Sequence, residues 1–122
     1  MKIFNRDGKI NFVDENNVLV GFYYESSCCE EFGYFLSRTF PDSLKPADVI
    51  QESDEAFAGF VFDTGFKEAV AFVERDDTDT VVFRLIRGLD IIYLTLHNTH
   101  NGYYSHGFDM TQNGITIHSG SL

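Results

Sequence analysis

The sequence predicts an α+β fold, rich in strands, in which a curved antiparallel sheet packs against one main helix. Short runs of β-branched and aromatic residues follow one another along most of the chain. The breaks between the later runs are about two to five residues long, too short for the crossover that joins parallel strands. Only residues 26–41 have the spacing of a helix. We expect residues 1–122 to form a single domain, with a half-open barrel as an alternative form of the sheet.

The chain begins with three runs that we expect to form an antiparallel meander. Residues 2–5 and 9–13 flank Asp7-Gly8, a dipeptide typical of a tight hairpin turn. Residues 14–17 are polar turn formers, and they precede the third run, residues 18–25. Each run therefore pairs with the next one along the chain.

The next segment, residues 26–41, has the pattern of one amphipathic helix that ends at Pro41. Ser27 and Glu30 have the spacing of a capping box, in which each side chain accepts a hydrogen bond from a backbone N–H. Gly33 costs this helix about 1 kcal/mol relative to alanine. The apolar face repeats at helical spacing and consists of Cys28, Phe32, Phe35 and Leu36.

Residues 42–55 are expected to form an irregular connection, after which the chain is almost entirely strand. The six later strands are predicted at residues 59–63, 67–74, 80–87, 91–98, 103–111 and 115–118. Asn101-Gly102 indicates a tight hairpin between the fourth and fifth of these. That turn would place His97 directly opposite His106, on one face of the sheet.

Charge and composition exclude several classes of protein. The chain has nine basic and nineteen acidic residues, a formal charge of −10, which opposes binding to phosphate backbones. We therefore expect no direct nucleic-acid binding. No apolar run approaches the roughly 18 residues of a membrane span, and no stretch near the start has the length of a secretion signal. The only cysteines, Cys28 and Cys29, are adjacent and could bridge each other only with strain. These features predict a cytoplasmic protein that does not bind membranes.

Cysteine and histidine residues offer one candidate site. Opposed strand residues have Cβ atoms about 4.5–5.5 Å apart, so His97 and His106 could contact one metal ion. Zinc needs three or four protein ligands, which Cys28 and Cys29 would have to complete. A cysteine at a helix N-terminus could also act as a nucleophile, although Glu30 in the same turn would raise the pKa of its thiol. The alternative is that both cysteines pack in the core.

Two segments, SCCEEFGYF and VVFRLIRGLDIIYLTLHNTHNGYYSHGF, together resemble a group of small bacterial and phage proteins of unknown function, the DUF7448 type. The resemblance covers a minority of the chain, and His97 and His106 are not part of it. It implies that any shared binding site or packing signature lies at Cys28, Cys29, Glu30, Asn101, Gly102, Tyr103, Tyr104 and Ser105.

Two functions remain open at this point. The first is a non-catalytic protein-interaction module that binds a protein partner through a sheet edge or the tyrosine-rich hairpin, without a cofactor. Self-association into a homo-oligomer is compatible with it. The alternative is a pocket in which the cysteines and histidines bind a metal ion or perform thiol chemistry. The sequence favours the first, because no Walker loop, GxSxG or HExxH motif is present.

Overall fold

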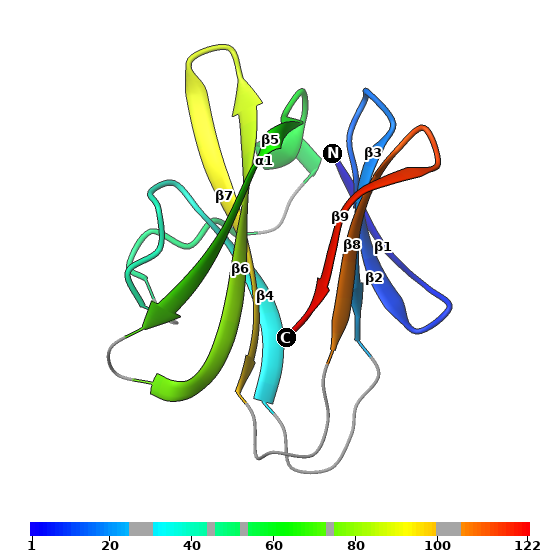
Figure 1. The fold of residues 1–122 in the computed structure, drawn as a ribbon. Coiled ribbons are helices and arrows are strands. Elements are labelled where there is room, and N and C mark those ends of the chain that lie inside the picture. Colours follow the sequence, from blue (N-terminus) through cyan, green and yellow to red (C-terminus); the bar gives the residue numbers. More distant parts are fainter. Residues whose placement is uncertain (25–30, 44–45, 52–53, 73–74, 100–105) are drawn as a thin grey trace.

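The computed structural model describes residues 1–24, 31–43, 46–51, 54–72, 75–99 and 106–122. These residues form two antiparallel sheets that pack face to face (Figure 1). The five-stranded sheet has the order β1-β2-β3-β8-β9, and the four-stranded sheet has the order β4-β7-β6-β5. The strands are β1 (Lys2–Arg6), β2 (Lys9–Val13), β3 (Val18–Tyr23), β4 (Glu31–Ser37), β5 (Val61–Phe72), β6 (Arg75–Arg87), β7 (Asp90–Thr99), β8 (Gly107–Gln112) and β9 (Ile115–Ser121).

The predicted α+β class is wrong, because the chain is nearly all β and has no main helix. Within the predicted helix, residues Glu31–Ser37 form strand β4, which pairs along its length with β7. The expected capping box lies outside the described residues. Among the described residues the one helix is α1 (Asp54–Phe57), a single turn, and no helix there is long and apolar enough to cross a membrane. The two sheets remain separate layers, so the half-open barrel is also wrong.

The N-terminal meander is confirmed. Strands β1, β2 and β3 pair in sequence order, and the β1–β2 register runs from Lys2 opposite Val13 to Arg6 opposite Lys9. The turn between them uses Asp7 at φ 55° and Gly8 at φ 75°. Two successive positive φ values match the twist of the flanking strands, which explains the Asp-Gly pair.

The later strands differ from the prediction in two places. The expected turn at residues 64–65 is instead a bulge within β5, where the register shifts between Phe62 and Lys67. The expected hairpin between β7 and β8 is wrong, because these strands belong to different sheets. Strand β7 pairs with β4 and β6, whereas β8 pairs with β3 and β9.

The core lies between the two sheets and is built from alternate residues of each strand. Edge-to-face ring pairs join the layers: Phe12 and Tyr34 have centroids 5.1 Å apart, and Phe83 and Phe108 have centroids 5.9 Å apart. The fully buried side chains include Phe12, Val18 and Phe22 of the five-stranded sheet and Phe83, Leu85, Leu94 and Leu96 of the four-stranded sheet.

A buried carboxylate ties the two sheets together. Asp14, which is 8% exposed, follows β2. Its Oδ1 accepts hydrogen bonds from the N–H groups of Asn16 and Val18, both at 2.9 Å. Its Oδ2 accepts a 2.7 Å hydrogen bond from the N–H of Phe62, in the other sheet. One side chain therefore shapes the β2–β3 turn and fixes the start of β5.

Strand β9 packs closely over β8 at a glycine. Gly120 lies opposite Phe108, and a Cβ atom on Gly120 would stand 2.8 Å from the ring of Phe108. Phe108 is 8% exposed and belongs to the core, so its ring has little freedom to move aside. By contrast, a Cβ atom on Gly107 would stand 3.8 Å from its nearest contact.

We predict that Asp14→Asn destabilises the protein by about 1–3 kcal/mol, because the new amide N–H₂ would face the N–H of Phe62 and leave it unpaired. Urea denaturation measures this change. Glu15→Gln, an exposed neighbour, is the control and should stay within about 0.5 kcal/mol of wild type. Equal midpoints for the two variants would contradict the role of Asp14.

We also predict that Gly120→Ala destabilises the protein by about 1–3 kcal/mol, because the added methyl group overlaps the buried ring of Phe108. Thermal unfolding followed by circular dichroism measures the effect. Gly107→Ala places the same methyl group in ordinary contact, so it should leave the melting temperature unchanged or raise it. A Gly120→Ala protein as stable as Gly107→Ala would show that the Phe108 ring yields freely.

Candidate functional site at an open sheet edge

The residues that the family resemblance singled out fall outside the described part of the chain. These are Cys28, Cys29, Glu30, Asn101, Tyr103, Tyr104 and Ser105. The described residues on either side of these two segments lie close together. Glu31 pairs with Thr99 across β4 and β7, and the ring of His106 stacks on Phe32 with centroids 4.0 Å apart. The described residues on either side of both segments therefore lie at the same end of the sandwich (Figure 1).

His106 is part of an aromatic cluster at this end. It is 4% exposed, and its Nδ1–H donates a 2.9 Å hydrogen bond to the carbonyl oxygen of Tyr23. Its backbone pairs with Leu122 in both directions, at 2.9 and 2.8 Å. Tyr24 packs edge-to-face on Phe32, 5.0 Å away. These contacts fasten the end of β9 to the interior and account for His106 as a packing residue.

His97 lies elsewhere, so the predicted pairing of the two histidines is wrong. Its neighbours across β7 are Gly33 in β4 and Thr80 in β6. The ring of His97 covers Gly33, where a Cβ atom would stand 3.2 Å from it. Residues on either side of His97 point into the core, which places His97 on the outer face of the four-stranded sheet. His106 lies on the inner side, against Phe32.

No three His, Cys, Asp or Glu side chains group closely enough to hold a metal ion within the described residues. The alternative site needs Cys28, Cys29, His97 and His106 together. The two cysteines lie outside the described residues, and a sheet separates the two histidines. The described residues therefore do not bring His97 and His106 together, as this site would require.

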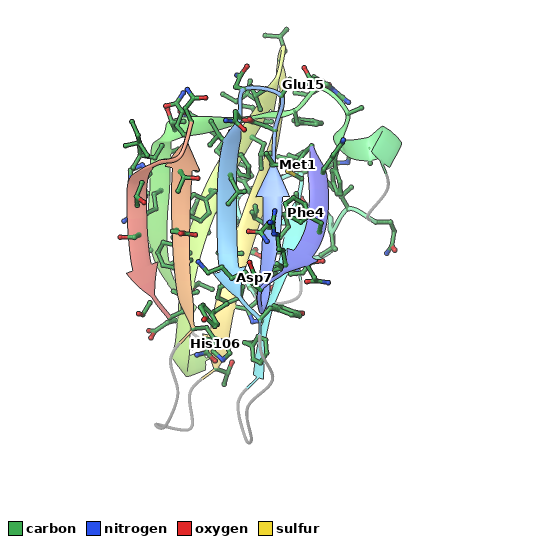
Figure 2. The ribbon with its side chains drawn as sticks, turned by 90° about the vertical axis from the view of Figure 1, so that its right-hand side faces the viewer. Met1, Phe4, Asp7, Glu15 and His106 are labelled. Carbon is green, nitrogen blue, oxygen red and sulfur yellow. The ribbon has the colours of Figure 1, made fainter. Side chains whose placement is uncertain are left out.

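A hollow of about 780 Å³ lies beside β1, lined in part by Met1 and Glu15, two residues that Figure 2 labels. Asp14 also lines it, but both oxygens of its carboxylate already accept backbone hydrogen bonds. Asp14 therefore has little remaining capacity to accept hydrogen bonds from a ligand in this hollow. A better candidate lies at the opposite edge of the same sheet.

Two sheets have four edge strands, and three of them are protected against pairing with another chain. Strand β1 carries Lys2 and Arg6. Strand β4 is covered by the segment before α1, because the N–H of Ile50 donates a 2.8 Å hydrogen bond to the carbonyl oxygen of Leu36. Strand β5 carries three charged residues and a bulge.

Strand β9 is the exception among these edges. Its seven residues, ITIHSGS, include no Asp, Glu, Lys or Arg. Ile115 is 70% exposed and Ile117 is 37% exposed. A hollow of about 380 Å³ adjoins its end, lined by Ala69, Val70, Thr78, Asp79, Thr80, Ser121 and Leu122. An uncharged edge with exposed β-branched residues is a template for strand pairing.

The bulge of β5 supports β9 from the other sheet. His118 Nε2–H donates a 2.8 Å hydrogen bond to the carbonyl oxygen of Thr64 in this bulge. Arg84 donates hydrogen bonds from Nε and Nη2 to Asp63, and its guanidinium lies 4.4 Å from the ring centroid of Phe66. The hydrogen bond from Arg84 holds the pKa of Asp63 below its ordinary value of 3.8. The stabilisation by this pair is therefore present above that value and is lost as the pH falls through the lowered pKa.

Sequence reasoning identified residues 115–118 as a strand but did not identify its importance. The signal was present in the composition of residues 115–121, ITIHSGS, which include no charged residue. Its position at an edge depends on the pairing of β3 with β8, which spans the two ends of the chain.

Comparisons of this chain with protein-family models, with curated proteins and with solved structures found no match. The resemblance to the DUF7448 type therefore stays a prediction.

Proposed function

We propose that this chain is a non-catalytic protein-interaction module that adds an extended segment of a protein partner to the edge of β9. An edge strand has backbone N–H and C=O groups on its outer side that a partner strand can pair with. Main-chain hydrogen bonds would supply affinity, and the side-chain positions on both faces of the added strand would supply specificity. The lack of charge on β9 is the observation that carries this proposal.

The side chains of β9 suit such a partner. Ile115 and Ile117 offer exposed apolar contacts at the start of the strand. Ser119, Gly120 and Ser121 at its end are small, so they leave room for larger side chains of the partner. The His118 hydrogen bond to Thr64 holds the strand in place before binding. A preformed edge reduces the ordering cost of association.

A different protein is a better partner for this edge than a second copy of the chain. Two copies could pair their β9 strands, since the strand itself is uncharged. Each copy, however, carries a formal charge of −10, and like net charges oppose association. We therefore favour a partner with low or positive charge around its extended segment.

We predict that Ile115→Lys/Ile117→Lys abolishes partner binding without unfolding the protein. Two lysines place charge on the edge and oppose a second strand. Both side chains are exposed, so the free energy of unfolding should change by less than about 1 kcal/mol. The measurement is quantitative mass spectrometry of proteins retained by each bait from a lysate of the encoding organism.

Leu89→Lys is the matched control, because Leu89 is a fully exposed residue in the turn between β6 and β7. The expected partner is retained by wild type and by Leu89→Lys, and lost with the double variant. Hydrogen exchange of the purified complex should then show new protection at Ile115–Ser121. Equal retention on all three baits, no retained protein, or no protection of β9 would overturn the proposal.

A further inference from the structure

The N-terminal hairpin differs in charge from the rest of the molecule. Residues 1–13 contain three basic residues and one acidic residue, a net charge of +2. The other residues contain six basic and eighteen acidic residues, a net charge of −12. A third of all basic residues thus occupy β1 and β2, two neighbouring strands at the edge of the five-stranded sheet.

These basic residues share the outer face of the five-stranded sheet. Ile3 pairs with Phe12, which is a core residue, so Lys2, Phe4 and Arg6 point to the other side. Figure 2 looks onto this face, with Phe4 and Asp7 labelled.

One cross-strand row of this face brings two positive charges together. Arg6 stands directly opposite Lys9, and Lys9 stands opposite Tyr23. Like charges in direct opposition destabilise a sheet, so stability of the hairpin does not explain this row. Two adjacent cations on an exposed face suit an anionic ligand.

We propose that this surface, formed by Phe4, Arg6, Lys9, Asn11 and Tyr23 and called here the basic face, binds an acidic segment of a protein partner. A hollow of about 350 Å³ lies among these residues, and Asp7 and Leu19 also line it. Phe4 is 39% exposed and Tyr23 is 43% exposed, so the faces of two rings are open to contact.

The two cations of the basic face are only loosely engaged within the protein. Lys9 Nζ lies 3.5 Å from Asp109 Oδ2, and Arg6 Nε lies 3.8 Å from Asp7 Oδ2. Both distances exceed the roughly 2.7–2.9 Å of a charge-assisted hydrogen bond. The Arg6 pair is also almost fully exposed, and such pairs contribute little. Both groups therefore keep donors for a carboxylate.

Gly21 determines how Lys9 lies across the face. Asn11, Gly21 and Asp109 are successive neighbours on β2, β3 and β8. A Cβ atom on Gly21 would stand 2.8 Å from Asp109 Oδ1 and 3.6 Å from Lys9 Cδ. Without that atom, the alkyl chain of Lys9 extends over β3 towards Asp109, with its ammonium 5.6 Å from the ring centroid of Tyr23. Asp109 thus acts as a positioning residue for Lys9.

A peptide suits the basic face better than a small molecule. Sites for small molecules enclose about 70–90% of the ligand surface, whereas this hollow is open on the face of a sheet. An acidic side chain would meet Arg6 and Lys9, and a neighbouring aromatic or apolar side chain would contact Phe4 and Tyr23. Each of these two cations has one acid close by, Asp7 beside Arg6 and Asp109 beside Lys9, and salt screens the acids that lie beyond about 8 Å at physiological ionic strength.

The basic face is tested by titrating isotope-labelled protein with the blocked peptide Glu-Phe-Glu-Phe-Glu and recording amide NMR shifts. We expect saturable shifts at Phe4, Arg6, Lys9, Asn11 and Tyr23. Gln-Phe-Gln-Phe-Gln keeps the rings but removes the charge, so its affinity should be at least tenfold lower. Shifts centred on β9 instead would overturn this proposal and leave the proposed function standing, since the two surfaces are separate.

Arg6→Gln/Lys9→Gln should weaken binding of the acidic peptide at least tenfold. Arg38→Gln/Lys67→Gln removes the same net charge at two exposed positions, one directly after β4 and one in β5. This variant should leave binding unchanged. Arg6→Gln alone removes a 78% exposed side chain and serves if the double variant fails to fold. Equal weakening by both double variants, binding of benzoate as tight as the peptide, or salt-sensitive dimerisation through Arg6 and Lys9 would each overturn the proposal.

Discussion

Burial of one face of each sheet against the other is the interaction on which the rest of the structure depends. Each large apolar side chain moved from water into this layer contributes about 1.5–3 kcal/mol, and the layer contains residues such as Phe12, Phe22, Phe83 and Leu94 that are fully buried. Both sheets must therefore present alternate apolar residues to each other. This constraint divides strands that are consecutive in the chain, such as β7 and β8, between the two layers. The side on which each polar residue lies follows from that division.

The parts of the fold that local patterns determine were predicted well. The three-stranded meander depends on Asp7-Gly8 and on strict alternation, both of which can be read along the chain. The segment around Phe32 and Leu36 was ambiguous, because apolar residues at positions 32, 34, 35 and 36 fit a helix and a strand buried on both sides equally well. Pairing with β7 decided in favour of the strand. The bulge in β5 was read as a turn because Thr64 and Gly65 are turn-forming residues.

The candidate site was harder to predict, since it depends on which strands lack a neighbour. The histidine pairing assumed that the turn signal at Asn101-Gly102 joined two strands of one sheet. In the structure His97 instead faces outward beside Thr80, and His106 stacks on Phe32 inside. Strand β9 was found as a strand, but its open edge is a property of the whole sheet. No local pattern contains that information.

The distribution of charge connects the two proposed surfaces. An uncharged edge invites uncontrolled strand pairing, and proteins usually cover or charge such edges. Here three edges are protected and β9 is not, so another feature has to keep copies apart. A net charge of −10 would do this, because like net charges oppose self-association of whole molecules while leaving the backbone of β9 accessible. The same excess of acid makes the cations of β1 and β2 stand out. If both proposals hold, a sheet with an uncharged strand at one edge and a basic face at the other would distinguish partners by both shape and charge.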